Sequence, residues 1–403
     1  MNLVETSQAI QAGNVSLGIE LGSTRIKAVL ITADYNTVAA GSYNWENKLE
    51  NNVWTYSLED VWAGIQTSYK QLAAEVQSKY HQPITNIKAI GISAMMHGYL
   101  AFDQADNLLV PFRTWRNNIT GQAADELTKL FNFNIPQRWT IAHLYQAILN
   151  DEAHVNELDF VTTLAGYVHW QLSGEKVLGT GDASGGVFPI DPATGYYDQK
   201  MLDQFSAQAN VKKYPWNIEK VLPAVKPAGQ AAGQLTETGA KLLDPTGNLQ
   251  GGSLMAPPEG GDAGTGMVGT NSVRQRTGNI SVGTSAFSMV VLDQSLKQVH
   301  RDIDIVMTPD GSPVAMVHVN NCSSDINAWT SLFGDFAQRL GVDVPADKLY
   351  GTLFLEATRA DPNAGGLINY SYLSGENITK MDAGRPLFVR TPLTVTSIYL
   401  TSC

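Results

Sequence analysis

Residues 15–32 read VSLGIELGSTRIKAVLIT, two β-rich runs on either side of the short turn Gly22-Ser-Thr24. A third β-rich run covers Thr37–Trp45, and Ser57-Leu-Glu-Asp60 is a capping box that starts an amphipathic helix. A further strand is expected at Ile87–Ala94. The order β-β-β-α-β predicts an α/β domain whose first element is this hairpin.

The second half of the chain repeats this order of elements. Its segment Ile280-Ser-Val-Gly-Thr-Ser285 aligns with Ile19-Glu-Leu-Gly-Ser-Thr24 of the first hairpin. The elements expected here are strands at Thr277–Val282, Ala286–Leu292 and Val314–Val319, then a helix capped by Ser324. A repeated order with a repeated turn predicts two duplicated α/β lobes that face each other, with a domain boundary at residues 248–252.

The composition narrows the class of protein. The 403 residues hold 27 Lys and Arg against 38 Asp and Glu, a net charge of −11, which argues against nucleic acid or an anionic membrane as a partner. Two cysteines exclude a disulfide scaffold and favour a reducing compartment. The N-terminus lacks signal-peptide features, and no stretch reaches the roughly 18 apolar residues of a membrane span. We therefore expect a cytoplasmic protein.

Two glycine turns support a hypothesis of phosphate binding. Gly22-Ser23-Thr24 and Gly283-Thr284-Ser285 each lie between two β-rich runs. Backbone N–H groups and short hydroxyls in such turns can hold an anion, although either turn alone is more often an ordinary hairpin turn. Their equivalent positions in the two halves favour a polyphosphate. A P-loop sequence is missing, so the phosphates are not expected to bind as in P-loop enzymes.

Asp262 follows Gly260-Gly261 at the start of an expected helix. It can be interpreted as the N-cap of that helix or as a general base for a hydroxyl group, and both roles can hold together. The helix also contains Gly264-Thr-Gly-Met-Val-Gly269, which matches a dinucleotide fingerprint. Because no strand directly precedes this run, a nicotinamide-dependent dehydrogenase is a discounted alternative.

Two further segments carry candidate sugar contacts. Met96 and His97 follow the strand expected at Ile87–Ala94, where α/β proteins usually contact ligands. A single histidine is nevertheless more often structural than functional. Trp115-Arg-Asn-Asn118 offers an aromatic face and forked hydrogen-bond donors suited to a polyol, and it could equally be a solvated turn.

Taken together, these motifs resemble the FGGY carbohydrate kinases of the actin/hexokinase-like superfamily, most nearly the xylulokinase-like branch. The matching motifs are Ile19–Thr24 and Gly283–Ser285 for phosphate, Gly260–Asp262 for the catalytic aspartate and Met96–Gly98 for the sugar. The resemblance implies two ribonuclease-H-like lobes around a cleft. Residues 14–250 are then the sugar-binding domain, and residues 251–403 are the nucleotide-binding domain.

The resemblance also implies a reaction, the transfer of the γ-phosphoryl group of ATP to a sugar hydroxyl. The expected substrate is a ketopentose such as xylulose or a related ketose or polyol. Asp262 is the implied base, and the implied sugar contacts are Met96, His97, Trp115, Asn117 and Asp262. Gly22, Ser23, Thr24, Gly283, Thr284 and Ser285 are implied to bind the ATP phosphates, and Glu20 to hold Mg²⁺ through water. A homodimer is an open alternative for the assembly.

Three departures from the family pattern qualify this expectation. Glu20 stands where the family usually has Asp, and Asn117 stands at an acidic sugar-contacting position. The second change weakens the expectation of D-xylulose itself and keeps that of a keto-sugar or polyol. The uncharged tail Thr391–Cys403 matches nothing in the family, which predicts a truncated chain with an incomplete second lobe. A catalytically inactive sugar-binding fragment of such a kinase is therefore the alternative.

Overall fold

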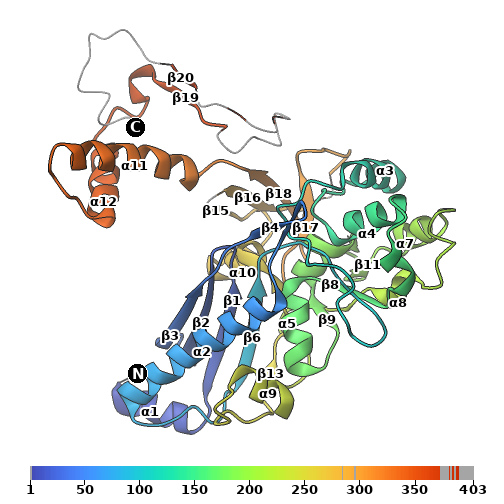
Figure 1. The fold of residues 1–403 in the computed structure, drawn as a ribbon, viewed down its shortest axis with the longest axis horizontal. Coiled ribbons are helices and arrows are strands. Elements are labelled where there is room, and N and C mark those ends of the chain that lie inside the picture. Colours follow the sequence, from blue (N-terminus) through green and yellow to red (C-terminus); the bar gives the residue numbers. More distant parts are fainter. Residues whose placement is uncertain are drawn as a thin grey trace. The chain divides into compact units, whose positions relative to one another are not determined.

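The computed structural model describes residues 2–283, 285–294, 296–372, 381, 384 and 387–389 (Figure 1). The chain forms two compact units. The first consists of Met1–Asn279 and Met289–Met316, and the second of Ile280–Ser288 and Val317–Cys403. The domain boundary expected at residues 248–252 stays a prediction.

The first unit is built on a mixed β-sheet. Its strands are β1 (Val15–Leu21), β2 (Arg25–Thr32), β3 (Thr37–Asn44), β6 (Ala89–Ala94), β13 (Leu254–Met255) and β14 (Glu259–Gly260). The order is β13-β6-β1-β2-β3, and β14 also pairs with β6. The hairpin β1–β2 and the pair β2–β3 are antiparallel, whereas β6 runs parallel to β1. The predicted order β-β-β-α-β is confirmed, with the short hairpin β4 (Lys48–Glu50) and β5 (Val53–Thr55) inserted after β3.

Helices cover one face of this sheet. The longest, α2 (Leu58–Tyr80), packs against β2 and β3, and α5 (Leu164–Ser173) packs against β6 (Figure 1). The predicted cap is confirmed, because the Ser57 side chain accepts a 3.0 Å hydrogen bond from the Asp60 backbone N–H. The apolar side chains of α2 are buried at the spacing that the sequence predicts, among them Val61 and Ile65. This burial against the sheet forms the core of the first unit.

The other elements of the first unit surround this core. The helices are α1 (Leu3–Gln11), α3 (Gly121–Phe131), α4 (Thr140–Leu149), a 3₁₀ helix (Ala153–Glu157), α6 (Thr180–Asp182), the π-helix η2 (Ala183–Val187), α7 (Gln199–Ser206), α8 (Ile218–Val221), α9 (Glu237–Leu243) and α10 (Gly261–Gly269). The strands are β7 (Leu100–Phe102), β8 (Phe160–Thr162), β9 (Val177–Gly179), β10 (Ile190–Asp191), β11 (Tyr196–Tyr197) and β12 (Ala224–Lys226).

A second sheet follows α10, in the order β15-β16-β18-β17. Its strands are β15 (Gly278–Val282), β16 (Ala286–Val291), β17 (Asp304–Met307) and β18 (Pro313–Val319). The three predicted strands are confirmed to within a residue at each end. The sequence missed β17, whose four residues are too few to show a periodicity of their own.

The second unit continues with helical structure. Its elements after β18 are α11 (Ser323–Arg339), α12 (Ala346–Ala357), a 3₁₀ turn (Ala364–Gly366), β19 (Ile368–Tyr370) and β20 (Leu387–Val389). The predicted helix α11 is confirmed, but the predicted cap is wrong, because Cys322 is the N-cap and Ser324 lies inside the helix. Within the described ranges, no helix combines the length and the hydropathy needed to cross a membrane.

Candidate active site

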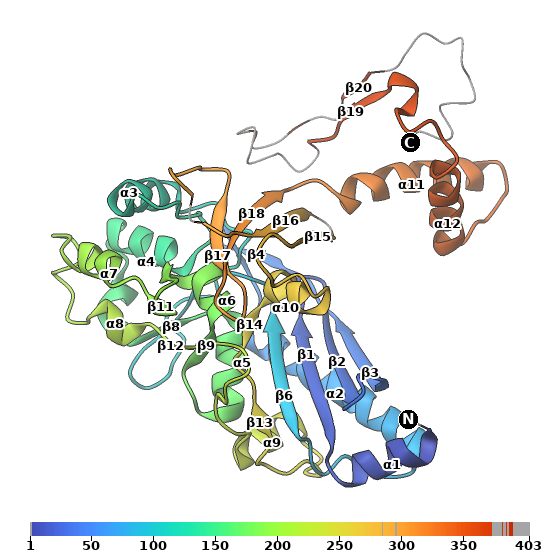
Figure 2. The ribbon, with the colours of Figure 1, turned by 180° about the vertical axis from the view of Figure 1, so that it is seen from behind.

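Three parallel strands of the first unit end at the same edge of the sheet. Figure 2 shows β1 beside β6 in this sheet. Leu21 of β1 and Gly260 of β14 both pair with Ala94 of β6. Each strand then leads directly into a segment that the sequence selected: Gly22–Thr24 after β1, Met95–His97 after β6, and Gly261-Asp262 after β14. Ligands of open α/β sheets bind at the carboxyl ends of the strands. The register therefore brings three of the predicted site segments to one edge.

Asp262 lies in the first turn of α10, as its second residue. The N-cap of this helix is Gly260, so the interpretation of Asp262 as the N-cap is wrong. A carboxylate in the first helical turn is still favoured by the partial positive charge of the helix N-terminus. The role of Asp262 as a general base stays a prediction.

The run Gly264–Gly269 lies wholly within α10. A dinucleotide fingerprint needs its glycines in the tight turn between a strand and a helix, where the backbone can approach a pyrophosphate. Helical glycines cannot form that turn. The structure therefore excludes this run as a nicotinamide-nucleotide fingerprint.

His97 sits in a strained backbone conformation directly after β6. Its φ is 68°, in the left-handed region, and its residue is only 5% exposed. This conformation costs a residue with a Cβ atom about 1–2 kcal/mol. Strain of this kind persists only where the surroundings enforce it, and it concentrates at functional sites. The backbone geometry thus supports a functional reading of His97.

A buried ion pair contacts the His97 ring. The Arg138 Nε–H donates a 2.9 Å hydrogen bond to His97 Nε2, and the same guanidinium forms an ion pair with Asp304. The Asn134 side-chain amide donates a 2.9 Å hydrogen bond to the other oxygen of Asp304. Burial raises the pKa of Asp304, while the Arg138 charge and these hydrogen bonds act in the opposite direction. The loop before α4 and strand β17 thus position the guanidinium that contacts the imidazole ring.

The π-helix η2 lies against the Met96–His97 segment. A Cβ atom on Gly186 would sit 3.3 Å from the His97 backbone nitrogen, and one on Gly185 would sit 2.7 Å from Met96 Cε. The π-helix is itself held by the Ser184 hydroxyl, which accepts a 2.9 Å hydrogen bond from the Met307 N–H. Single π-turns are rare and are frequent at functional sites. This segment is not among the predicted site segments. Its signal in the sequence is the run of small residues that directly follows Asp182.

Two buried carboxyl groups lie beneath the start of α10. The backbone N–H of Asp182 donates a 3.0 Å hydrogen bond to Glu259 Oε2, and the Thr163 hydroxyl donates a 2.5 Å hydrogen bond to Asp182 Oδ2. In the part of the chain that the structure describes, Asp182 Oδ1 and Glu259 Oε1 have no hydrogen-bond partner. Burial raises the pKa of Asp182 to about 7, and burial with the nearby Asp182 charge raises the pKa of Glu259 to about 8. The pair therefore retains protons near neutral pH.

The turn Gly22–Thr24 is fixed by its neighbours in the first unit. The Gly22 carbonyl accepts a 2.7 Å hydrogen bond from the Trp45 indole N–H, and the Ser23 carbonyl accepts a 2.6 Å bond from the Tyr56 hydroxyl. The Gly22 N–H closes the hairpin onto the Arg25 carbonyl at 2.9 Å. Two carbonyls of this turn are thus each bonded to a large aromatic side chain of the same unit.

The equivalent turn of the second unit has different contacts. The Gly283 N–H donates to the Ser285 carbonyl at 2.9 Å, and its own carbonyl accepts a 3.0 Å bond from the Ser323 N–H at the start of α11. The Ser285 hydroxyl lies 3.0 Å from His318 Nε2 of β18. Thr284 lies outside the described residues. Phosphate binding at both turns stays a prediction.

Asn117 and Trp115 make contacts within their own loop, with β5 and with the core of the first unit. The Asn117 side chain is buried, and its amide makes hydrogen bonds of 2.8 Å to both the N–H and the carbonyl of Trp54 and of 3.0 Å to the Thr114 carbonyl. All of these partners are backbone groups, so this amide fixes the loop to β5. Trp115 is half-buried against the core of the first unit. Sugar contacts by both residues stay predictions.

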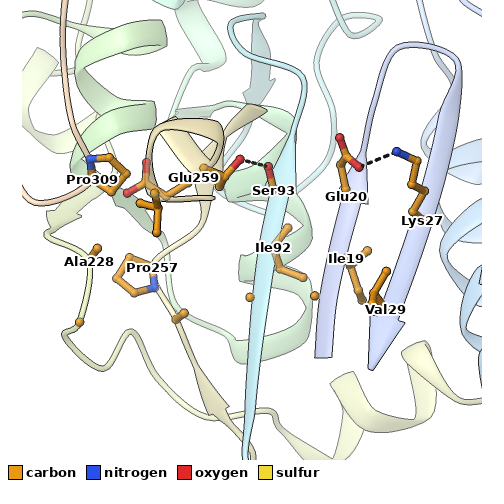
Figure 3. Close-up of a pocket in the computed structure, with 16 residues that line it drawn as sticks. Ile19, Glu20, Lys27, Val29, Ile92, Ser93, Ala228, Pro257, Glu259 and Pro309 are labelled. Carbon is orange, nitrogen blue, oxygen red and sulfur yellow. Dashed lines mark hydrogen bonds and ion pairs between the residues drawn. The ribbon is translucent and has the colours of Figure 1, made fainter. Parts of the chain in front are cut away.

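A cavity of about 440 Å³ opens on the sheet face of the first unit (Figure 3). Its floor is β1 and β6, and its rim includes Pro257, Pro309 and Glu259. Glu20 and Lys27 lie at one end, joined by a 3.2 Å ion pair (Figure 3). Both side chains are almost half exposed, so this pair adds little to stability. The Glu20 carboxylate is accessible from this cavity.

Comparison with known proteins gives the family. Residues 15–246 match the N-terminal domain of the FGGY family of carbohydrate kinases, and residues 278–398 match its C-terminal domain. The chain is 24% identical over 378 residues to the xylulose kinase of Klebsiella pneumoniae, covering 89% of this chain and 69% of that protein. It is 23% identical over 381 residues to the gluconokinase of Bacillus subtilis, covering 89% and 68% of the two chains.

A solved structure gives the same fold. The crystal structure of the xylulose kinase from Rhodospirillum rubrum matches with a TM-score of 0.74 at 16% identity, covering 96% of this chain and 75% of that chain. The predicted fold class, two actin/hexokinase-like ATPase lobes, is confirmed. Sugar kinases of this family use ATP as co-substrate. The chain belongs to the FGGY family of carbohydrate kinases and is a phosphotransferase enzyme.

Proposed function

We propose that this enzyme transfers the γ-phosphoryl group of ATP to a hydroxyl of a ketopentose such as xylulose, or of a related ketose or polyol. The observation that carries the proposal is the shared edge at which β1, β6 and β14 end. The sugar motif, a phosphate turn and the segment of the proposed base all leave the sheet there. Similarity to both a xylulose kinase and a gluconokinase is why the substrate is given as a class.

In this proposal Asp262 accepts the proton of the attacking hydroxyl group. Met96 and His97 position the sugar beside it, with Trp115, Asn117 and Asp262 as further contacts. The turns Gly22–Thr24 and Gly283–Ser285 bind the phosphates of ATP through backbone N–H groups and hydroxyls. Positioning and electrostatic stabilisation dominate phosphoryl transfer, so backbone donors and hydroxyls placed around the phosphates suit this task.

Mg²⁺ is the metal that we propose for this site, with Glu20 as the carboxylate that holds its water shell. The described residues contain no cluster of three or more His, Cys, Asp or Glu side chains that could bind a metal alone. Mg²⁺ usually keeps several waters and uses one or two carboxylates together with substrate phosphates, so one accessible carboxylate beside a phosphate turn fits it. When bound, the ion neutralises phosphate charge. The Glu20 carboxylate also forms an ion pair with Lys27.

We also propose a division of the chain into two domains, a location and an assembly. Residues 14–250 form the sugar-binding domain and residues 251–403 the nucleotide-binding domain. The protein acts in the cytoplasm, and a homodimer is the assembly to test by light scattering.

The Asp262→Asn variant tests the catalytic assignment. A general base acts in the transition state, so we expect kcat to fall by at least about a hundredfold while the sugar Kd stays within a few fold. Asp198→Asn is the matched control, because Asp198 caps α7 by accepting a 3.0 Å hydrogen bond from the Met201 N–H. Asn caps a helix about as well as Asp, so this control should keep full activity. Near-normal turnover by Asp262→Asn would remove Asp262 from the catalytic role.

A panel of ketoses, polyols and aldonates tests the substrate class. Phosphorylation is followed by coupled detection of ADP, and binding of each sugar and of Mg-ATP by calorimetry. The proposal expects turnover with at least one ketose or polyol. Sugar binding without nucleotide binding or turnover would favour the alternative, a catalytically inactive sugar-binding fragment.

A further inference from the structure

Arg138 lies outside the predicted motifs and contacts the His97 ring directly. Its Nε–H donates to His97 Nε2 at 2.9 Å. Its guanidinium is held in turn by the ion pair with Asp304, and both side chains are less than one-fifth exposed. The pair is therefore largely shielded from solvent. Charges and hydrogen bonds act more strongly in the protein interior than in water.

The chemistry of this contact decides the protonation of His97. A guanidinium has only donors and does not lose its proton in proteins. The nitrogen that accepts from it, His97 Nε2, must carry a lone pair. A neutral imidazole then carries its single proton on Nδ1. Doubly protonated His97 would place an N–H against an N–H and a positive charge beside the guanidinium.

The segment around Arg138 also contacts the backbone next to His97. The Gly98 N–H points at the Arg138 carbonyl at 3.4 Å, and the Thr140 hydroxyl donates a 2.6 Å hydrogen bond to the Gly98 carbonyl. Residues 138 and 140 thus contact the N–H and the carbonyl of Gly98, the residue that follows His97. One short segment at the start of α4 positions both the ring and the backbone of His97.

Other charged groups near His97 come from two further elements. Asp304 of β17 lies behind Arg138. Asp182 of α6 lies near the π-helix glycine Gly186, whose Cβ would sit within 3.6 Å of both Asp182 Oδ1 and the His97 backbone. Asp182 retains a proton near neutral pH, and the Arg138 guanidinium donates directly to the ring.

We propose that Arg138 is a positioning residue that keeps His97 neutral with its proton on Nδ1, so that the ring offers the sugar a hydrogen-bond donor. This inference rests on the proposed role of His97 in sugar binding. A donor at this position selects an oxygen acceptor on the substrate, such as a carbonyl or hydroxyl oxygen. Asp304 and Asn134 orient the guanidinium for this task.

The primary test is the tautomer of His97 in the free protein. Long-range ¹H–¹⁵N NMR spectra of protein with ¹⁵N-labelled histidine separate the two ring nitrogens of its seven histidines. His97→Gln identifies the His97 signals. We expect wild-type His97 to carry its proton on Nδ1 and to stay neutral from pH 5.5 to 8. A proton on Nε2, or an imidazolium above pH 6, would overturn the inference, and this result needs no active enzyme.

Variants of Arg138 test the cause. Arg138→Met with Asp304→Asn removes the donor and its counter-charge together, so His97 should show mixed tautomers. The sugar KM should rise about tenfold or more, with the ATP KM unchanged. Arg138→Gln keeps a side-chain N–H donor and should recover part of the tautomer preference. An unchanged tautomer in the double variant would refute the role of Arg138.

A matched control separates positioning from folding. Arg113 also forms a largely buried ion pair, in this case with Glu152. Among the described contacts, Arg113 makes no hydrogen bond to His97. Arg113→Lys should lower the melting temperature without changing the His97 tautomer or the sugar KM. If no sugar is phosphorylated by any form, the proposed function fails while the tautomer result still decides this inference. Normal turnover with the opposite tautomer overturns this inference alone.

Discussion

Two buried acidic clusters lie close to His97, and they are neutralised in different ways. Asp304 is paired with the Arg138 guanidinium and accepts a hydrogen bond from Asn134. Among the described residues Asp182 and Glu259 form no ion pair with a cation, and their hydrogen bonds come from a hydroxyl and from backbone N–H groups. A guanidinium balances the first cluster at every pH, whereas retained protons balance the second.

This difference has a consequence for stability. A carboxylate paired with arginine needs its partner, so the first cluster fails when one member is removed. The carboxyl pair Asp182–Glu259, which we call proton-balanced, is neutralised by bound protons and not by a cation. Its contribution to stability depends on pH, because the protons leave as the pH rises through the raised pKa values. The two clusters should therefore respond oppositely to charge removal.

The largest effect is expected where the cation-balanced cluster is broken. Asp304→Ala leaves the Arg138 guanidinium buried without its carboxylate. Breaking a buried ion pair from one side typically costs about 3–5 kcal/mol, and we expect a loss in this range in the free energy of unfolding. Urea denaturation at pH 7 measures it. A loss below about 1 kcal/mol, the range of an exposed pair, would show that the cluster is solvated.

A smaller effect of opposite sign is expected in the proton-balanced cluster. The folded pKa values of about 7 and about 8 lie above the ordinary values of 3.8 and 4.5. The folded state thus binds more protons than the unfolded state between about pH 4 and 8, and stability falls as the pH rises through this window. Glu259→Gln removes one of these protons, so it should stabilise the protein by about 1–3 kcal/mol at pH 8 and less at pH 5.

Denaturation curves at pH 5, 6, 7 and 8 measure this change. Above about pH 8 the difference between Glu259→Gln and the wild type should level off, since both carboxyl groups are then ionised in the folded state. Asp203→Asn is a control on an exposed carboxylate of α7 and should leave the pH dependence unchanged. A variant that is less stable than wild type at pH 8 would contradict the proton-balanced description.

The smallest effect is expected in the glycines that separate the second cluster from the sugar motif. An alanine at Gly186 places its Cβ 3.3–3.4 Å from backbone atoms of His97, which cannot rotate away. An alanine at Gly185 meets Met96 Cε, the flexible end of a side chain. We expect both variants to stay within about 1 kcal/mol of wild-type stability. Gly186→Ala alone should raise the sugar KM, by about threefold to tenfold, and an equal rise in both would contradict this.

The strands and the long helix could be predicted because their signals are local. Two β-rich runs on either side of a glycine turn predict the β1–β2 hairpin. Ser57 with Asp60 predicts the start of α2. Met96 and His97 could be selected because they follow a strand end. The start of α10 could not be fixed to the residue, since Gly260, Gly261 and Asp262 all suit a helix N-terminus.

The acidic clusters could not be predicted, because their contacts join distant parts of the chain. Asp182 and Glu259 are 77 residues apart, and Arg138 and Asp304 are 166 apart. No spacing rule connects such positions. The one local signal was Glu259 itself, a charged residue in the otherwise small and apolar stretch before Asp262. Its burial depends on strand pairing that single-sequence patterns do not reveal.

The glycines around the carboxyl pair make some substitutions depend on others. A Cβ on Gly181 would lie 2.5 Å from Glu259 Oε2, and a Cβ on Gly260 would lie 2.5 Å from Asp182 Oδ1. The side chain of one particular acid therefore prevents a larger residue at each glycine: Glu259 at Gly181, and Asp182 at Gly260. Gly181→Ala is disruptive while Glu259 keeps its length and becomes tolerable once that side chain is shortened. Changes at these positions are thus epistatic, and single-residue scans would overstate how intolerant each glycine is on its own.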